Sequence, residues 1–175
     1  MKLIIGLGNP GKQYQNTRHS LGQKIIKQFV ETFCKTSLTT KNNLSAQICE
    51  VGQGSDKTIF VIPTEYMNNS GVSVQKIAQY YKISPINIYV VHDDLDLIVG
   101  DYKVQFDRGP AGHNGIKSII EYLGTQQFNR IRIGIAKPQN NILIEDYVLQ
   151  PFSKEELDII NTLTPKIFEE IQNIL

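Results

Sequence analysis

Three side chains have the types and positions needed for acid–base chemistry. Asn9 lies in the turn Gly8-Asn9-Pro10-Gly11, directly after an apolar run, and His19 follows ten residues later in a polar stretch. Asp93 belongs to the acidic stretch 92–96, His-Asp-Asp-Leu-Asp, which follows another apolar run. A histidine can take a proton from water, a carboxylate can orient that histidine, and an amide can hydrogen-bond to a developing oxyanion. This combination favours a hydrolytic site.

The residues after His19 predict its protonation state. Apolar side chains recur at helical spacing from Leu21 to Phe33, so His19 is expected at or near a helix N-terminus. The positive end of a helix dipole lowers the pKa of a nearby imidazole. We therefore expect a neutral His19, the form that a general base requires.

The elements that must position these residues are apolar runs at 2–7, 58–62 and 87–91, which predict buried strands. A turn or loop follows each of them, and ligands bind beyond the carboxyl ends of parallel strands. If the three strands are parallel, Asn9, His19, Asp93 and the segment 66–68 converge on one edge of the sheet. The helix that begins at 113–115 could close this cleft.

The remaining patterns complete one α/β domain over residues 1–175, a mixed, mostly parallel twisted sheet flanked by helices. Further strands are expected at 44–51, paired with 58–62 through the turn 52–57, and at 101–106 and 130–136. Residues 36–43 are expected to form a loop. A capping box at 153–156 begins the last helix, which Pro165 is expected to kink or divide.

Two other site types have weaker support. The sequence GLGNPG at 6–11 fits the dinucleotide fingerprint, but Pro10 follows the glycines and the candidate acid, Glu31, lies in a helical pattern. A metal site could use the stretch 92–96, but the sequence has no H-x-x-x-H or C-x-x-C spacing. Solvated loop acids, with Asp96 capping a turn, are a further interpretation of that stretch.

An asparagine at 68 or 69 fits a plain helix cap.

The net charge of +1 conceals an uneven distribution of charge. Residues 1–49 hold seven Lys/Arg against one acid, and residues 103–137 hold six against two. If these segments share a face, they form a footprint for a polyanion; otherwise they are solvated surface. No apolar run approaches the roughly 20 residues that span a bilayer.

Six separated blocks resemble the bacterial-type peptidyl-tRNA hydrolases. They are GLGNPGKQYQNTRHSLG, PTEYMNNSG, VHDDLDL, GHNGIKSII, FNRIRIGIAKP and YVLQPFSKEE, and they run from residue 2 to about residue 160. The resemblance implies hydrolysis of the ester between a peptide and the 3′ ribose of tRNA, which frees tRNA for reuse in translation. It also implies a cytoplasmic monomer that acts on the acceptor end of peptidyl-tRNA, needs no metal or cofactor and does not bind membranes.

The resemblance also implies roles for individual residues. His19 matches the catalytic base, Asp93 the carboxylate that holds it, and Asn9 the residue that separates N-blocked from free aminoacyl substrates. The residues that match substrate and tRNA contacts are Tyr14, Tyr66, Met67, Asn68, Asn114, Lys103 and Arg132. A catalytically silent RNA-binding relative is the alternative, but such a protein would not need Asn9, His19 and Asp93 together.

Two features depart from the family pattern. The loop before Gly112 is usually glycine-rich, whereas here it reads Asp-Arg-Gly-Pro-Ala at 107–111, which predicts a stiffer and more charged loop. Relatives also commonly continue beyond the position of Leu175, so contacts made by such an extension are not expected here.

Overall fold

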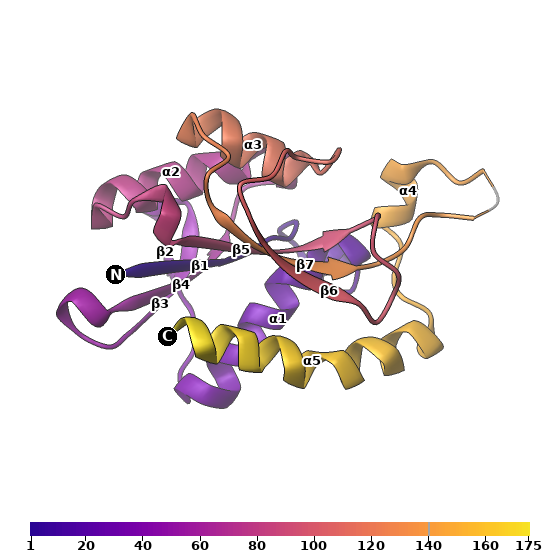
Figure 1. Cartoon of the computed structure of the whole chain (residues 1–175), viewed down its shortest axis with the longest axis horizontal. Helices are drawn as coiled ribbons and strands as arrows, with labels where there is room; N and C mark the ends of the chain where they lie inside the picture. The colour runs from indigo at the N-terminus through magenta and orange to yellow at the C-terminus, as the bar shows by residue number, and fades with distance from the viewer. Residues whose placement is uncertain (140) are drawn as a thin grey trace.

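Residues 1–139 and 141–175, described by a computed structural model, contain a seven-stranded mixed sheet in the order β2-β3-β4-β1-β5-β7-β6 (Figure 1). The strands are β1 (Lys2–Gly6), β2 (Thr39–Lys41), β3 (Ala46–Val51), β4 (Thr58–Pro63), β5 (Ile88–Asp94), β6 (Tyr102–Phe106) and β7 (Asn129–Gly134). The four strands β4, β1, β5 and β7 are parallel, whereas β2, β3 and β6 add antiparallel edges. The predicted α/β class and mostly parallel centre are confirmed.

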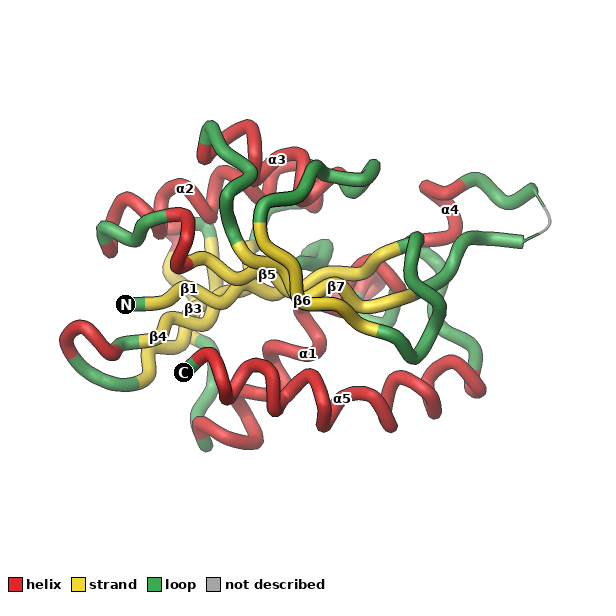
Figure 2. Tube along the Cα trace, in the orientation of Figure 1, coloured by secondary structure: helices red, strands yellow, loops and turns green. Residues whose placement is uncertain are grey.

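Helices cover both faces of this sheet, as the tube view shows (Figure 2). They are α1 (Leu21–Phe29), α2 (Ser70–Tyr81), α3 (Asn114–Leu123), α4 (Ile144–Val148) and α5 (Lys154–Ile174). The side chains of α2 and α3 belong to one apolar cluster and those of α1 and α5 to another, on opposite faces of the sheet. Burial on both faces explains why the central strands are continuous apolar runs.

Close contact between α1 and β5 brings the two candidate catalytic residues together. Gly22 lies one turn beyond His19, and a Cβ placed on it would lie 2.1 Å from the carbonyl oxygen of Val91. The same Val91 oxygen accepts a hydrogen bond from the Leu7 N–H at 3.1 Å. A side chain at position 22 would therefore force α1, and His19 with it, away from the strand that carries Asp93.

Three sequence predictions differ from the structure at local points. The predicted loop 36–43 contains the short edge strand β2, which pairs with β3. Strand β5 continues through Asp94 instead of ending near residue 91, so Asp93 lies inside the strand. Helix α4 was not predicted. It spans only 5 residues, which is too short for the helical spacing of apolar residues to be recognised in the sequence.

Helix α5 is continuous past Pro165, so of the two predicted outcomes, a kink or a division, the division is wrong. Ile160 and Leu163 before the proline and Ile167 and Ile171 after it are all buried in one cluster. Burial of each such side chain is worth about 1.5–3 kcal/mol. Together they outweigh the roughly 3 kcal/mol that an interior proline costs.

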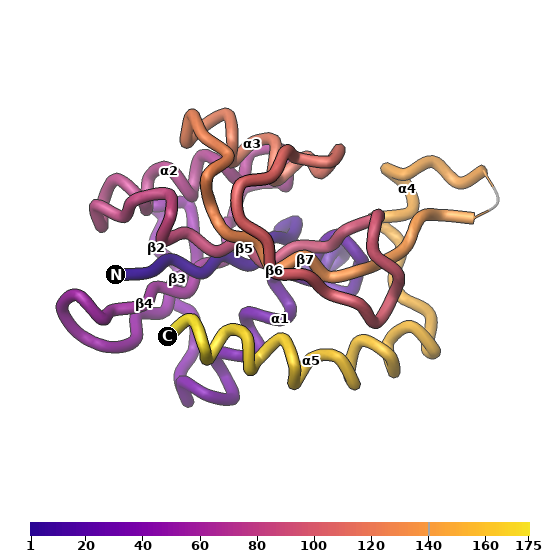
Figure 3. Tube along the Cα trace, in the orientation of Figure 1, coloured from indigo at the N-terminus to yellow at the C-terminus, as the bar shows by residue number. Residues whose placement is uncertain are grey.

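The two ends of the chain lie near each other, as the coloured trace shows (Figure 3). Lys2 Nζ donates a hydrogen bond to the carbonyl oxygen of Leu175 at 3.2 Å. Within the described ranges, no helix is both long and apolar enough to cross a bilayer.

Candidate active site

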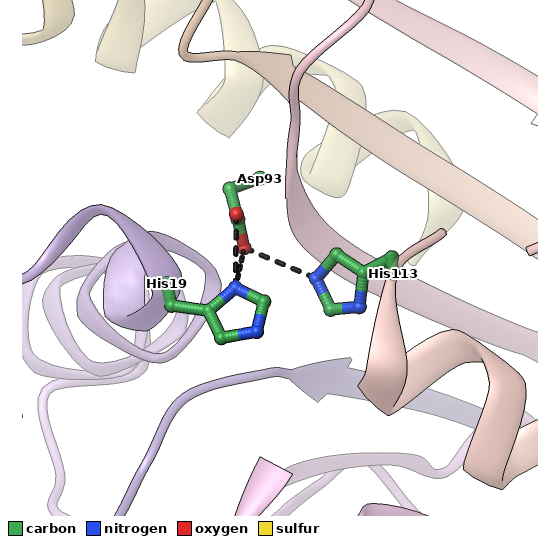
Figure 4. A group of neighbouring side chains, drawn as sticks. All are labelled: His19, Asp93 and His113. Carbon is green, nitrogen blue, oxygen red and sulfur yellow. Dashed lines mark hydrogen bonds and ion pairs between the residues drawn. The ribbon is translucent and has the colours of Figure 1, made fainter. Parts of the chain in front are cut away.

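His19 and Asp93 form a buried hydrogen-bonded pair (Figure 4). His19 lies in a 3₁₀ turn, Arg18–Ser20, immediately before α1, and Asp93 lies near the end of β5. His19 Nδ1 is 3.0 Å from Asp93 Oδ2 and 3.1 Å from Oδ1. The two residues are 7% and 2% exposed. The predicted convergence of these residues on one edge of the sheet is confirmed.

His113 is a second partner of the same carboxylate and was not assigned a role from the sequence. Its Nε2 lies 3.1 Å from Asp93 Oδ1, and its ring centroid is 4.7 Å from that of His19 (Figure 4). The sequence pattern places His113 only at the start of a helix. Its position directly before Asn114, in a chain with three histidines, was the available signal.

The protonation of both rings follows from their partners. His113 is the N-cap of α3, and its Nδ1 accepts hydrogen bonds from the backbone N–H groups of Gly115 and Ile116. Nδ1 therefore carries no proton, so the proton of the neutral ring is on Nε2, which donates to Asp93. His19 donates to the same carboxylate through Nδ1–H. Its Nε2 is then unprotonated and able to accept a proton.

Burial and charge act on the three groups in opposite directions. Burial alone lowers the pKa of His19, but the charge of Asp93 and its hydrogen bonds raise it, and the net pKa lies above the ordinary 6.5. The prediction of a lowered pKa is therefore wrong, because a contacting carboxylate outweighs the helix terminus. For Asp93, burial raises the pKa, and the charges and hydrogen bonds of His19 and His113 lower it well below its usual range. Burial gives His113 a lowered pKa.

His92 is a buried neighbour of Asp93 and His113. It is 3% exposed, its Nδ1 donates to the backbone carbonyl of Asp93 at 2.7 Å, and its ring packs edge-on against His113. Burial, and then the neighbouring His113, lower the pKa of His92 to about 3. A neutral His92 thus packs against His113 and bonds the Asp93 backbone without adding charge.

The other acids of the stretch 92–96 have separate partners. Asp94 Oδ2 accepts from Arg132 Nε at 2.7 Å, and Asp94 Oδ1 accepts from the Asp96 N–H at 2.9 Å. Asp96 pairs with Lys137 Nζ at 3.0 Å. Asp93 and Asp94 are buried, so their interpretation as solvated loop acids is wrong, and Asp94 rather than Asp96 caps the turn. The carboxylates of this stretch therefore do not converge on one point, as the ligands of a metal ion would have to.

Within the described ranges, the one metal-like grouping is His19, Asp93 and His113, whose candidate ligand atoms lie within 4.8 Å of one another. A metal ligand must present a lone pair, but His113 Nε2 carries a proton because its Nδ1 caps α3. Binding a metal there would require loss of the cap or an imidazolate. The donor set therefore fits a hydrogen-bonded carboxylate better than a metal.

Asn9 is held in one orientation beside this cluster. Its Oδ1 accepts from the Met67 N–H at 2.8 Å, and its backbone N–H donates to Ser20 Oγ at 3.2 Å. One lone pair of the amide oxygen is thereby used and the orientation of the amide is set, so the Nδ2 amino group can donate to a ligand. Ser20, another residue missed from the sequence, links the Asn9 turn to the segment of His19.

The remaining predicted contact residues differ in their exposure and neighbours, and of these only Asn114 lines the cavity beside His19 within the described ranges. Tyr14 and Tyr66 lie edge to face with ring centroids 6.4 Å apart, and Tyr66 is 55% exposed. Asn68 and Asn114 are exposed, whereas Met67 is buried against the start of α3. The N-cap of α2 is Asn69, within the predicted pair 68 and 69, although its side chain makes no capping hydrogen bond; Asn68 is therefore not the cap.

Several cations of the predicted basic footprint are buried or paired. Arg132 is 3% exposed and bonds Asp94, while Lys103, its register partner on β6, is exposed. Arg18 pairs with Glu156 at 2.7 Å, and Arg130 is buried against the loop 107–111. Burial makes Arg132 and Arg130 unsuited to direct phosphate contact. Charge counted along the sequence therefore overstates the basic surface.

The unusual loop 107–111 is fixed to the sheet. Arg130 donates to the backbone carbonyls of Gly109, at 2.8 Å, and Arg108. Asp107 and Ala111 have positive φ values of 51° and 48°. A non-glycine residue in that region is held there by its surroundings. These contacts give a physical reason for the expected stiffness, which stays a prediction. Ala111 and Gly112 line the cavity beside Asp93.

A cavity of about 480 Å³ is lined by both His19 and Asp93. Its polar side comes from His19, Asp93, His113 and Asn114, and its apolar side includes Leu95, Ile142, Leu143, Ile144 and Val148. A pocket of this size with a few convergent polar groups suits an organic ligand.

Comparisons with known proteins agree with this geometry. A family model described as peptidyl-tRNA hydrolase matches residues 3–175. The chain is 45% identical over 175 residues to the peptidyl-tRNA hydrolase of Rickettsia conorii, covering 100% of this chain and 94% of that protein. It is 45% identical over 160 residues to that of Mesoplasma florum, covering 91% and 85%.

A solved structure gives the same result. The crystal structure of peptidyl-tRNA hydrolase from Acinetobacter baumannii matches with a TM-score of 0.92 and 28% identity, over 99% of this chain and 88% of that one. The resemblance found in the six sequence blocks is thus confirmed over the length of the chain, and the chain belongs to the peptidyl-tRNA hydrolase family.

Proposed function

We propose that this protein hydrolyses the ester that joins a peptidyl or N-acyl-aminoacyl group to the 3′ ribose of tRNA. The observation that carries the proposal is the orientation of His19. Its Nδ1 donates to a buried Asp93, and within the described ranges no hydrogen bond to its Nε2 is found, on a ring that lines the cavity. An unprotonated Nε2 at a cavity surface is the group that a water nucleophile needs.

The reaction follows from this orientation. His19 Nε2 takes a proton from water as the water oxygen forms a bond to the ester carbonyl carbon. The π electron pair of the C=O bond moves to the carbonyl oxygen. Collapse of that intermediate breaks the bond to the ribose oxygen, which takes the proton back from His19. Asp93 stays ionised and stabilises the transient imidazolium. A general base of this kind is worth about 10²–10⁴-fold in rate.

His113 is a positioning residue in this scheme. Because its tautomer is fixed by α3, it supplies Asp93 with a second donor of constant orientation. The carboxylate is thus held between two rings and cannot rotate away from His19. A hydrogen bond to a charged group contributes about 1.5–3 kcal/mol.

Asn9 contributes a hydrogen-bond donor. Since the Met67 N–H orients the amide through its oxygen, the amino group can donate either to the carbonyl of an N-acyl amide or to the developing oxyanion. A free amino group offers no such acceptor. This supports selection of N-blocked substrates. The selection then depends on one hydrogen bond from the Asn9 amino group, and not on two hydrogen bonds that use both the amino group and the oxygen of its side chain.

The tRNA is assigned to the polar rim of the site. Tyr14, Tyr66, Asn68, Asn114 and Lys103 are at least partly accessible and suit stacking, hydrogen bonding and phosphate contact. Arg132 acts indirectly in this proposal, by fixing Asp94 beside Asp93. The proposal also assigns the protein to the cytoplasm, as a monomer that needs no metal.

The test is release of labelled acyl-amino acid from N-acetyl-aminoacyl-tRNA in the presence of a chelator, with the same tRNA carrying a free amino acid as the comparison. We expect hydrolysis of the blocked substrate and little of the free one. Binding of tRNA without hydrolysis of either would favour a silent RNA-binding relative instead.

A further inference from the structure

Arg18 precedes His19 in the chain and is as deeply buried as the base, with 6% of its surface exposed. Its Nη2 donates to both oxygens of Glu156, at 3.0 and 2.7 Å, and its Nη1 donates to the Pro151 carbonyl at 2.7 Å. Replacing a buried ion pair by apolar residues of similar volume is often neutral or stabilising. Stability alone therefore does not account for an arginine at this position.

The turn that carries His19 needs support from outside. It is a 3₁₀ helix of 3 residues, Arg18–Ser20, and such short helices have poor hydrogen-bond geometry. The backbone N–H of Arg18 donates to the Gln150 carbonyl at 3.1 Å, and the residue before Arg18 forms a β-bridge with Pro151. The segment before α5 thus holds the turn immediately in front of the base.

Glu156, the partner of Arg18, is itself fixed at the start of α5. Its side chain accepts from the Ser153 N–H at 2.7 Å, and its own N–H donates to Ser153 Oγ at 3.2 Å, which together form a capping box. The carboxylate that receives Arg18 therefore belongs to a helix of 21 residues whose buried face lies in the same apolar cluster as α1. Arg18 attaches the base to a rigid element of the fold.

Arg18 is also connected to the strand that carries Asp93. Its guanidinium lies 4.2 Å from the centre of the Tyr147 ring, a distance typical of a cation–π contact. Tyr147 Oη donates to the Ile135 carbonyl at 2.6 Å, and the Ile135 N–H donates to the Asp94 carbonyl at 3.0 Å. Asp94 is the neighbour of Asp93 in β5.

The hydrogen bond between His19 and Asp93 closes these contacts into a circuit (Figure 4). We call it the positioning circuit; its members are His19, Arg18, Tyr147, Ile135, Asp94 and Asp93. All six residues are buried. Because the circuit is closed, a displacement of Arg18 or Tyr147 changes the distance between the base and its carboxylate. A misplacement of about 1 Å can lower a rate by roughly 10²-fold.

We propose that Arg18 is a positioning residue for the catalytic base: through Glu156 and Tyr147 it fixes the distance and angle at which His19 meets Asp93. This inference rests on the proposed function, because it concerns the base of that reaction. Arg18 acts through its neighbour, since the described residues that line the cavity do not include it.

The charges around His19 give this role a measurable consequence. The titratable groups that share its cavity are Asp93, Asp94, His113 and Glu145. The charge and hydrogen bonds of Asp93 raise the pKa of His19, whereas burial lowers it. A looser contact with Asp93 should therefore lower the pKa of His19, because burial remains. Loss of the positive charge of Arg18 would act in the opposite direction, so the test needs variants that keep every charge.

Two variants loosen the positioning circuit without changing its charges. R18K keeps the cation but loses the planar fork, so it cannot hold Glu156 and the Pro151 carbonyl in the same way. Y147F keeps an aromatic ring under the cation and removes the hydrogen bond to Ile135. The two substitutions therefore act on different contacts of the same circuit.

The pKa of His19 is measured by NMR titration of the imidazole protons, and kcat and KM are measured with N-acetyl-aminoacyl-tRNA. The chain has three histidines, and the pKa values of His92 and His113 are lowered, which separates the His19 signal from theirs. The matched control is Y81F, which removes the 2.7 Å hydrogen bond from the Tyr81 hydroxyl to Glu50. Urea unfolding establishes that each variant is folded.

We expect R18K and Y147F to lower the pKa of His19 and to lower kcat by about 10–10²-fold, up to the effect of a misplacement of about 1 Å. KM should stay unchanged, because the substrate contacts are kept. Y81F should match the wild type in pKa, kcat and KM.

Retention of the wild-type pKa or of the wild-type kcat in either folded variant overturns the inference. So does an equal loss in Y81F, which would reduce Arg18 to a general contributor to stability, or a raised KM with unchanged kcat. If R18K does not fold, Y147F alone decides. A wild type that hydrolyses no N-acetyl-aminoacyl-tRNA would overturn the proposed function instead, and the NMR titration would still test the position of His19.

Discussion

Replacing Asp93 by asparagine should impair turnover through the tautomer of His19. Oδ1 accepts from His113, and both oxygens lie near His19 Nδ1. An asparagine has one oxygen and one NH₂ group, so it must set its NH₂ against one of the two rings. His113 cannot become an acceptor at Nε2, because its Nδ1 caps α3.

The least costly arrangement therefore turns the NH₂ group toward His19. Nδ1 of His19 then becomes an acceptor, and the proton of the neutral ring moves to Nε2. Nε2 is the atom that must accept a proton from water, so the ring can no longer act as the base. The corresponding change in serine proteases costs about 10⁴-fold in kcat. We expect D93N to lose roughly 10³–10⁴-fold in turnover of N-acetyl-aminoacyl-tRNA, with normal tRNA binding.

The same reasoning predicts a rescue. H113S keeps a capping oxygen for α3 and removes the ring that fixes the amide. In D93N/H113S the asparagine can turn its oxygen to His19, so the double variant should be faster than D93N by at least about tenfold, the worth of one net hydrogen bond. Single-turnover rates measured together with urea unfolding would separate chemistry from stability. If the double variant is no faster than D93N while both are folded, the tautomer argument is refuted.

The remaining predictions concern substrate and ligand binding. N9D keeps an acceptor for the Met67 N–H but lacks the donor, so it should narrow the ratio of kcat/KM between N-blocked and free substrates; an unchanged ratio would leave Asn9 as a turn residue only. K103A should lower the slope of log KM against log salt concentration by about 0.7–0.9, whereas K166A, which removes an exposed lysine of α5, should not; equal slopes would remove Lys103 from the tRNA site. Activity should survive EDTA, since His113 Nε2 is committed as a donor to Asp93; activity lost and then restored by one divalent ion, with tRNA folding controlled, would contradict this.

The sequence predicts well the features that a single short segment determines, such as strands, turns and helix ends. The apolar runs predict the central strands, and Gly8 and Pro10 mark the end of the first one. Gly124, whose φ of 69° suits a glycine, ends α3. The approach of Asn9, His19 and Asp93 also follows, because the carboxyl ends of parallel strands share one edge of a sheet.

Features that depend on partners from distant segments could not be predicted in this way. Apolar and polar residues alternate from Arg130 to Ile135, which predicts one polar face that carries Arg130 and Arg132. Strand β7 instead lies between β5 and β6, and both of its faces are buried. The raised pKa of His19 depends on contact with a carboxylate 74 residues away. The second donor to Asp93 requires the start of α3 to face β5, which no local pattern specifies.

The central claim is that His19 Nε2 is the base, and the pH dependence of kcat/KM tests it most directly. Protonated His19 cannot accept a proton, so activity should be low at acidic pH and rise as His19 loses its proton. Because Asp93 raises the pKa of His19, the midpoint should lie above 6.5. In H19A, turnover should fall by at least about 10²-fold and this rise should disappear, while tRNA binding is retained. A folded H19A enzyme that keeps near-normal turnover, or the same rise with pH, would contradict the account.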